Sequence, residues 1–107
     1  MSQHGWTPYE DGGTIGTAGT EQGAILADEE HEFGARITLE RCDDRMAVTC
    51  GIYGAMVHTV FASWEEGPAK YEAMKSELGQ FLEEYDNEAD EDFEVLCDFC
   101  SRFVNAW

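Results

Sequence analysis

Hydrophobic positions divide the chain into two halves with different periods. Residues 23–63 contain short apolar runs and stretches of two-residue alternation, which are typical of β-strands, whereas residues 67–107 carry apolar side chains every three or four positions, as amphipathic helices do. Residues 1–22 follow neither period and repeat a Gly-Thr pair three times, so they predict an irregular arm or an edge strand. The pattern therefore predicts strands first and helices second.

Four apolar runs are expected to form strands, and they cover residues 23–28, 35–42, 46–52 and 55–62. The gaps between the runs are short, and short gaps favour antiparallel hairpins over crossover connections. We therefore expect an antiparallel β-meander of four strands, or five if the arm contributes one.

Two turns give this meander a testable register. If residues 43–44 and 53–54 are each a two-residue hairpin turn, Ile37 pairs with Cys50, and Cys50 pairs with Val57. This register places the large apolar side chains of both middle strands on one face, which would then pack against the helices. A slip of one residue in either hairpin would turn a strand over, so the agreement favours this pairing.

The opposite face of the meander is then polar. Thr38, Thr49 and His58 fall in one row across it, and Arg36 and Glu40 flank Thr38 on the same strand. These five residues form the polar platform, the first candidate site, where an imidazole could bind a small anion or act in acid–base chemistry. The alternative is an ordinary half-exposed sheet face with a partly buried histidine.

Two helices are expected after the strands. Gly67 followed by Pro68 suits a helix start, because proline has no N–H group to lose in the first turn. A stripe with helical spacing follows, and it consists of Tyr71, Met74, Leu78, Phe81, Leu82 and Tyr85. A second and wider stripe consists of Phe93, Leu96, Cys97, Cys100, Phe103, Val104 and Trp107.

These elements predict a two-layer α+β fold in which the two C-terminal helices pack on one face of the meander. The length of 107 residues suits a single domain with one hydrophobic core. Within residues 1–107 we expect an arm over 1–22, the meander over 23–63 and the helical pair over 67–107.

The net charge restricts the expected partners most. The chain has 23 acidic and 6 basic residues and a net charge of -17. Nucleic acids and anionic membrane surfaces need basic side chains, so neither is an expected partner, whereas basic proteins and cations are. The N-terminus lacks a secretion-type pattern and no apolar run has membrane length, so we expect a cytoplasmic protein with reduced cysteines.

Ten carboxylates fall between Ser76 and Ser101, a stretch without a single Lys or Arg. They are Glu77, Glu83, Glu84, Asp86, Glu88, Asp90, Glu91, Asp92, Glu94 and Asp98. Because the apolar helical stripes run through the same stretch, these carboxylates should lie on the outer faces of the two helices. This acidic surface is the second candidate site.

The four cysteines do not make a convincing metal or redox site. Cys97 and Cys100 have the spacing of half a zinc site, but Cys42 and Cys50, the only other cysteines, fall on opposite faces of the expected hairpin. Carboxylates beside the pair at 97 and 100 disfavour a reactive thiolate. Buried structural thiols are therefore expected.

Two acidic segments resemble cation sites only in part. Residues 86–97 lack the Gly and Glu that a calcium loop needs at its sixth and twelfth positions, which leaves weak, unpatterned binding of Ca²⁺ or Mg²⁺ as the alternative to a solvated turn. Residues 28–32 could hold a divalent ion, or they form a strand end that pairs with Arg36. No metal, cofactor or catalytic residue is predicted.

Three functions remain open. The leading prediction is a non-catalytic interaction module, of inhibitor or immunity type, whose acidic surface docks a basic protein partner. The alternative is a ligand-binding or enzymatic domain that uses the polar platform, and the third assigns the acidity to solubility at high salt. The wide apolar stripe of the second helix, with Trp107 at its end, also favours a homodimer.

Overall fold

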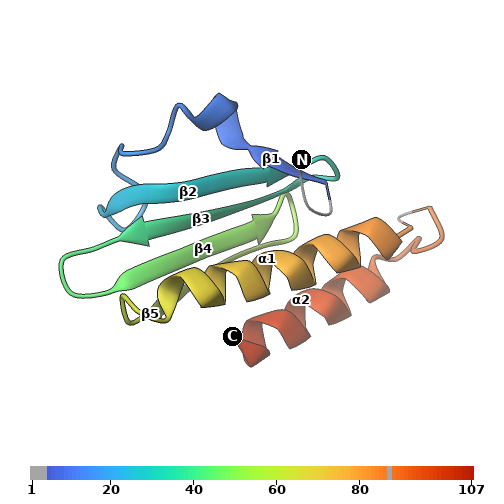
Figure 1. Ribbon diagram of the computed structural model, residues 1–107. Helices are drawn as coiled ribbons and strands as arrows, with labels where there is room; N and C mark the ends of the chain where they lie inside the picture. The colour runs from blue at the N-terminus through green and yellow to red at the C-terminus, as the bar shows by residue number, and fades with distance from the viewer. Residues whose placement is uncertain (1–4, 87) are drawn as a thin grey trace.

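The computed structural model describes residues 5–86 and 88–107, so the first four residues of the predicted arm, which covers 1–22, lie outside the described residues. One antiparallel sheet, with neighbouring strands in chain order, is followed by two helices (Figure 1). The elements are β1 (Trp6–Pro8), the short 3₁₀ segment η1 (Tyr9–Gly12), β2 (Ala24–His31), β3 (Ala35–Arg41), β4 (Met46–Ile52), β5 (Met56–Ala62), α1 (Gly67–Glu84) and α2 (Glu94–Ala106). The predicted α+β fold is confirmed, and the arm supplies the fifth strand.

The hairpin of β3 and β4 has the predicted register. The N–H group of Cys42 donates to the carbonyl of Arg45 at 2.8 Å across a two-residue turn. Ile37 therefore lies opposite Cys50, and Thr38 lies opposite Thr49. Ile37 and Cys50 point toward the helices and are buried, as expected.

The predicted register of β4 and β5 is wrong by one residue. The turn contains three residues, because Ile52 pairs with Met56, and Gly54 within it adopts a φ of 78°. Cys50 consequently pairs with His58 rather than with Val57. Both faces of β5 carry large apolar side chains, so the hydrophobic pattern could not decide between the two registers.

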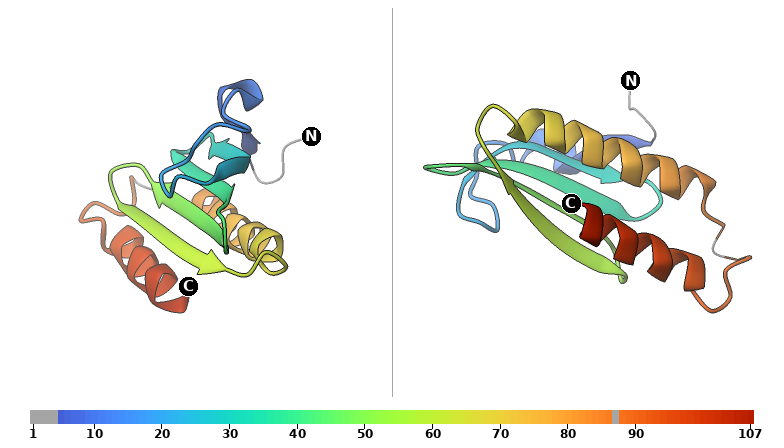
Figure 2. Two further views of the ribbon diagram at one scale, coloured as in Figure 1. Left: turned by 90° about the vertical axis from the view of Figure 1, so that its left-hand side faces the viewer. Right: turned by 90° about the horizontal axis from the view of Figure 1, so that it is seen from below.

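The helices cover one face of the sheet. α1 lies against β3 and β4, where Met74 and Leu78 join the buried cluster that contains Ile37. α2 runs alongside α1 on the side of β5 (Figure 2). The ring of Phe81 on α1 stacks on the ring of Phe99 on α2, with centroids 3.9 Å apart. The two predicted apolar stripes thus form one core with the sheet.

A charged contact also ties α1 to β2. Lys75 is buried despite its charge, and its ammonium lies 3.1 Å from a carboxylate oxygen of Glu29. The hydroxyl of Tyr71 donates to the same oxygen at 2.6 Å. Glu29 therefore points toward the helices, away from its neighbours Asp28 and Glu30, as alternation along a strand requires.

Neither of the two helices in the described part of the chain has the length and apolar character needed to span a membrane.

Candidate functional site

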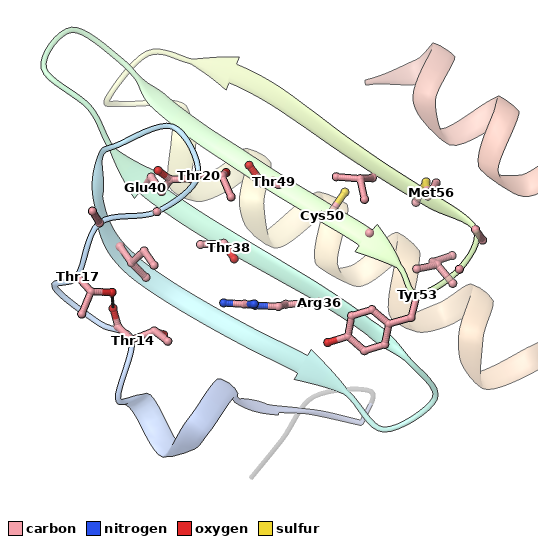
Figure 3. A pocket seen from close by; sticks show the side chains of 18 residues that line it. Thr14, Thr17, Thr20, Arg36, Thr38, Glu40, Thr49, Cys50, Tyr53 and Met56 are labelled. Atoms are coloured by element: carbon pink, nitrogen blue, oxygen red, sulfur yellow. Dashed lines mark hydrogen bonds between the residues drawn. The ribbon is translucent and has the colours of Figure 1, made fainter.

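The face of the sheet that points away from the helices, called the open face here, is partly covered by the arm. Residues 9–23 run along one side of this face and leave a hollow beside them (Figure 3). The guanidinium of Arg36 lies 3.7 Å from the centre of the Tyr9 ring, which is a cation–π contact. The hydroxyl of Thr14 donates to Asp28 at 2.8 Å. The arm is thus held by side chains of β2 and β3.

Glu40 anchors the far end of the arm. Its side chain is fully buried, and one carboxylate oxygen accepts hydrogen bonds from the N–H groups of Glu21 and Gly23, at 3.1 and 3.2 Å. A Cβ atom at Gly19 would overlap this carboxyl group, so only glycine permits such a close approach. The predicted binding residue Glu40 is therefore committed to the arm.

Arg36 is committed as well. Its guanidinium donates to both oxygens of Asp28, at 2.9 and 2.6 Å, in a forked arrangement. This hydrogen bonding with Asp28 raises the pKa of Arg36 in spite of partial burial. Thr38 also donates to Asp28, at 3.3 Å. The positive charge is neutralised locally, so the small anion expected on the polar platform has no free cation to bind. The expected pairing of the 28–32 segment with Arg36 is present.

The hollow beside the arm is a cavity of about 880 Å³, called the open-face cavity. Its lining includes five threonines, from the arm and the sheet: Thr14, Thr17, Thr20, Thr38 and Thr49. Its apolar lining includes Ile25 and Val57 from the open face, and atoms of Ile52 and Met56, whose side chains point toward the helices. Among the lining residues, Arg36 and Glu40 are the charged ones, and both already have partners. The surface offered to a ligand is therefore apolar with hydroxyl groups.

Tyr53 forms the rim of this cavity at the β4–β5 turn. Its hydroxyl donates to Glu30 at 2.7 Å. Desolvation and this hydrogen bond raise the pKa of Tyr53 to about 12, so the hydroxyl remains protonated at neutral pH. Thr49 lies on the floor, and its hydroxyl oxygen is 3.1 Å from that of Thr59, which is outside the cavity lining.

Four residues of the polar platform, Arg36, Thr38, Glu40 and Thr49, line the open-face cavity, but His58 does not. The one-residue shift of β5 turns His58 toward α2, where its ring lies edge-on to Phe103 at 6.4 Å. Its Nε2 atom is buried without a hydrogen-bond partner among the described residues. The imidazole expected at the centre of the platform belongs to the helical face instead.

The sequence also missed the contribution of the arm. The three Gly-Thr pairs supply threonine hydroxyls and the close approach at Gly19, yet the pairs alone predict only a loop. The signal that could have found them is the repetition itself, because small and hydroxylated side chains at regular intervals suit a segment that lies flat on a sheet.

Nine of the ten predicted acidic-surface residues are exposed, and Asp90 is the exception. The carboxylate of Asp90 accepts hydrogen bonds from the N–H groups of Val95 and Leu96, each at 3.1 Å, and from the hydroxyl of Tyr85 at 2.8 Å. These amides belong to the first turn of α2, where no intrahelical acceptor exists. Asp90 therefore caps α2 and is not free to meet a partner.

The cysteines do not converge. Burial raises the pKa of Cys50 to about 12 and also raises that of Cys100, so both remain thiols at neutral pH. Cys97 is exposed and Cys42 is partly exposed. In the described part of the chain, no group of three or more His, Cys, Asp or Glu side chains is arranged to hold a metal ion.

A comparison of the sequence and the structure with known protein families, curated proteins and solved structures gave no match.

Proposed function

We propose that this protein is a binding module that holds an uncharged, mainly apolar small molecule in the open-face cavity. The observation that carries the proposal is a cavity of about 880 Å³ whose charged lining residues are already paired. Ligand pockets of roughly 300–1,000 Å³, mostly apolar with a few polar groups that orient the ligand, are the usual sites for small molecules.

The lining supports binding rather than catalysis. The shift of β5 takes His58 away from the cavity, and Arg36 is engaged by Asp28. A general acid or base must reach the reacting atom with an available proton or lone pair, and neither of these side chains does so from its present position. The Tyr53 hydroxyl and most threonine hydroxyls of the lining already donate to protein acceptors, so they suit a ligand that carries hydrogen-bond donors at its ends.

The test uses Nile red, an uncharged dye that fluoresces strongly in apolar pockets, because an anionic dye would be repelled by the net charge of -17. The variant Thr49→Ile should abolish most of the fluorescence gain, since the larger side chain fills the cavity floor. Thr59→Ile is a matched control, because Thr59 lies opposite Thr49 and shares its hydroxyl contact but is not part of the cavity lining.

We expect the wild type and Thr59→Ile to bind the dye alike. Equal loss in both variants would point to a general effect of the substitutions on the sheet, and no loss in Thr49→Ile would place the dye elsewhere. Either result would contradict the proposal.

We propose as a second function that the acidic surface docks a basic protein partner. The observation that favours it is the exposure of nine of the ten carboxylates in a stretch without Lys or Arg. Such a surface raises the association rate and the specificity for cationic partners, and its effect weakens as salt screens the charges.

A decalysine peptide provides a direct test, with binding measured by NMR at low and high salt. We expect shifts that cluster on α1 and α2 at low salt and disappear near 0.5 M, where the screening length is roughly 4 Å. A double variant, Glu88→Gln with Glu91→Gln, should weaken binding. A peptide that fails to bind at low salt would contradict this second function.

A further inference from the structure

One end of the molecule has a second cavity, of about 460 Å³. The residues that line it come from the β2–β3 turn, the β4–β5 turn, the end of α1 and the start of α2. Four aromatic rings line it, those of Phe33, Tyr53, Tyr85 and Phe93. We call it the aromatic cavity.

Three of these rings are unusually exposed for large aromatic side chains. Phe33 is 58% exposed, Tyr53 is 55% exposed and Phe93 is 54% exposed. Single exposed hydrophobic residues are common, but several that line one cavity mark an interaction site. Tyr85 differs, because its hydroxyl is bonded to Asp90 and its ring stacks on Phe81.

The charged residues that line the cavity have one sign. Glu83 and Asp86 line it, and none of its lining residues is Lys, Arg or His. The segment from Ser76 to Ser101 that forms its helical wall contains no basic residue. The faces of aromatic rings attract cations, and carboxylates add to the attraction, so both features of the lining favour a positively charged guest.

The backbone holds Phe93 at the mouth of the cavity. Phe93 precedes α2 with a φ of 57°, a left-handed conformation that is unfavourable for a bulky side chain. Its N–H group donates to the carbonyl of Asp90 at 3.0 Å, and its own carbonyl accepts from Cys97 at 2.9 Å. The capping by Asp90 and these two bonds fix the backbone from which the ring projects.

We propose that the aromatic cavity takes the guanidinium group of an arginine from a basic protein segment. Arginine fits better than lysine, because a planar guanidinium can stack on a ring while it donates a fork of hydrogen bonds to a carboxylate such as Asp86. The inference rests on the second proposed function and names the anchor through which the acidic surface recognises its partner.

The test compares two blocked pentapeptides, Gly-Arg-Gly-Arg-Gly and Gly-Lys-Gly-Lys-Gly, titrated into the full chain at low salt and followed by NMR. The arginine peptide should shift the amide signals of Phe33 and Phe93 and bind more tightly than the lysine peptide. Phe33→Leu and Phe93→Leu should each weaken the arginine peptide roughly two- to fivefold, because leucine keeps apolar bulk without a ring face.

Two further variants separate the cavity from the general charge. Asp86→Asn removes a carboxylate that lines the cavity, and Glu91→Gln removes an exposed carboxylate outside it. The first should erase most of the preference for arginine over lysine, whereas the second should weaken both peptides equally.

The outcomes distinguish an arginine anchor in the aromatic cavity from general docking of cations on the acidic surface. If both peptides bind with equal strength and the leucine variants bind as the wild type does, the aromatic cavity is not the anchor, although the acidic surface still docks cations. If neither peptide binds the wild type, both proposals are wrong. The mapping of shifts on the wild type decides the question even where a variant folds poorly.

Discussion

At the scale of single residues, Asp90 has an environment unlike that of its acidic neighbours. Burial alone would raise the pKa of Asp90, but hydrogen bonds from the amides of Val95 and Leu96 and from the hydroxyl of Tyr85 outweigh it. The net effect lowers the pKa of Asp90. Ionised Asp90 therefore stabilises the start of α2, where the helix dipole also favours a negative charge.

Replacement of Asp90 by Ala should lower the midpoint of thermal unfolding at pH 7 by about 4–8 °C, as the loss of a helix cap does in a domain of this size. Circular dichroism measures the change. Glu91→Ala is the control, because Glu91 is an exposed neighbour and should change the midpoint little. Equal effects of the two substitutions would contradict the capping role.

The same contribution should depend on pH. A lowered folded-state pKa means that the stabilisation is complete above the unfolded pKa of about 3.9 and is lost as pH falls through the folded value. The difference in midpoint between the wild type and Asp90→Ala should therefore shrink in acid below about pH 3.9.

Sequence reasoning could not separate Asp90 from the other carboxylates. The usual capping position before α2 is occupied by Phe93, whose side chain cannot accept a hydrogen bond, and Asp90 reaches the helix from three residues further upstream. The left-handed backbone conformation of Phe93 makes this contact of Asp90 with the helix possible, and no local sequence pattern predicts it. The three exposed rings of the aromatic cavity were missed for a related reason, since they come from three separate segments.

At the scale of elements, the attachment of α1 to the sheet combines apolar packing with one ionic contact. Two carboxylates approach the Lys75 ammonium, Glu29 from β2 at 3.1 Å and Glu72 from α1 at 3.2 Å. The Glu29 side chain is 23% exposed, whereas that of Glu72 is 59% exposed. The two contacts have similar lengths but differ in access to water. This difference decides how much each contributes to the free energy of unfolding.

Glu29→Ala should reduce the free energy of unfolding by about 2–4 kcal/mol, because it leaves the buried Lys75 ammonium and the Tyr71 hydroxyl without their acceptor. Glu72→Ala should cost less than about 1 kcal/mol, since water replaces an exposed partner. Urea unfolding of both variants measures the difference. Comparable losses would show that burial does not distinguish these two carboxylates.

The strands also show where the hydrophobic pattern is sufficient to predict the pairing. The β3–β4 register was predictable because Ile37 and Leu39 on β3 and Val48 on β4 lie on one face, and the opposite face of both strands carries no large apolar side chain. In β5, Val57 and Val60 lie on opposite faces, and the observed register leaves Val57 82% exposed. The turn geometry at Gly54 decided the pairing, and the platform prediction failed at His58 for that reason.

The wide apolar stripe of α2 is partly used within the chain. Phe99 and Phe103 are buried, and the indole N–H of Trp107 donates to Glu77 at 3.2 Å. Val95 and Val104 remain exposed on the outer side. The homodimer stays a prediction, and light scattering measures it directly.

At the scale of the whole molecule, the net charge of -17 is spread over a body of 43 × 29 × 20 Å. The screening length is about 30 Å at 0.01 M salt and about 3 Å at 1 M. Most carboxylates therefore repel one another at low salt, whereas only immediate neighbours do so at high salt. The fold class was predictable at this scale because two periods, alternation and helical spacing, occupy separate halves of the chain.

Thermal stability should accordingly rise with sodium chloride, by several degrees between 0.01 and 1 M. Differential scanning calorimetry provides the measurement. The double variant Glu88→Gln with Glu91→Gln should start from a higher midpoint at low salt and rise less. A rise that continues steeply beyond 1 M, where screening is complete, would favour the third prediction, that the acidity is an adaptation to high salt; a flat response would contradict the repulsion argument.

The three-residue turn between β4 and β5 has a consequence for how such a site could change. A slip of β5 by one residue, to a two-residue turn in which Ile52 pairs with Ala55, would reverse the sidedness of β5. Val57 and Phe61 would then replace Met56 and Val60 beneath the helices, and His58 would emerge in the open-face cavity. A binding module without an imidazole in its cavity and one with it are separated here by a single step of strand register.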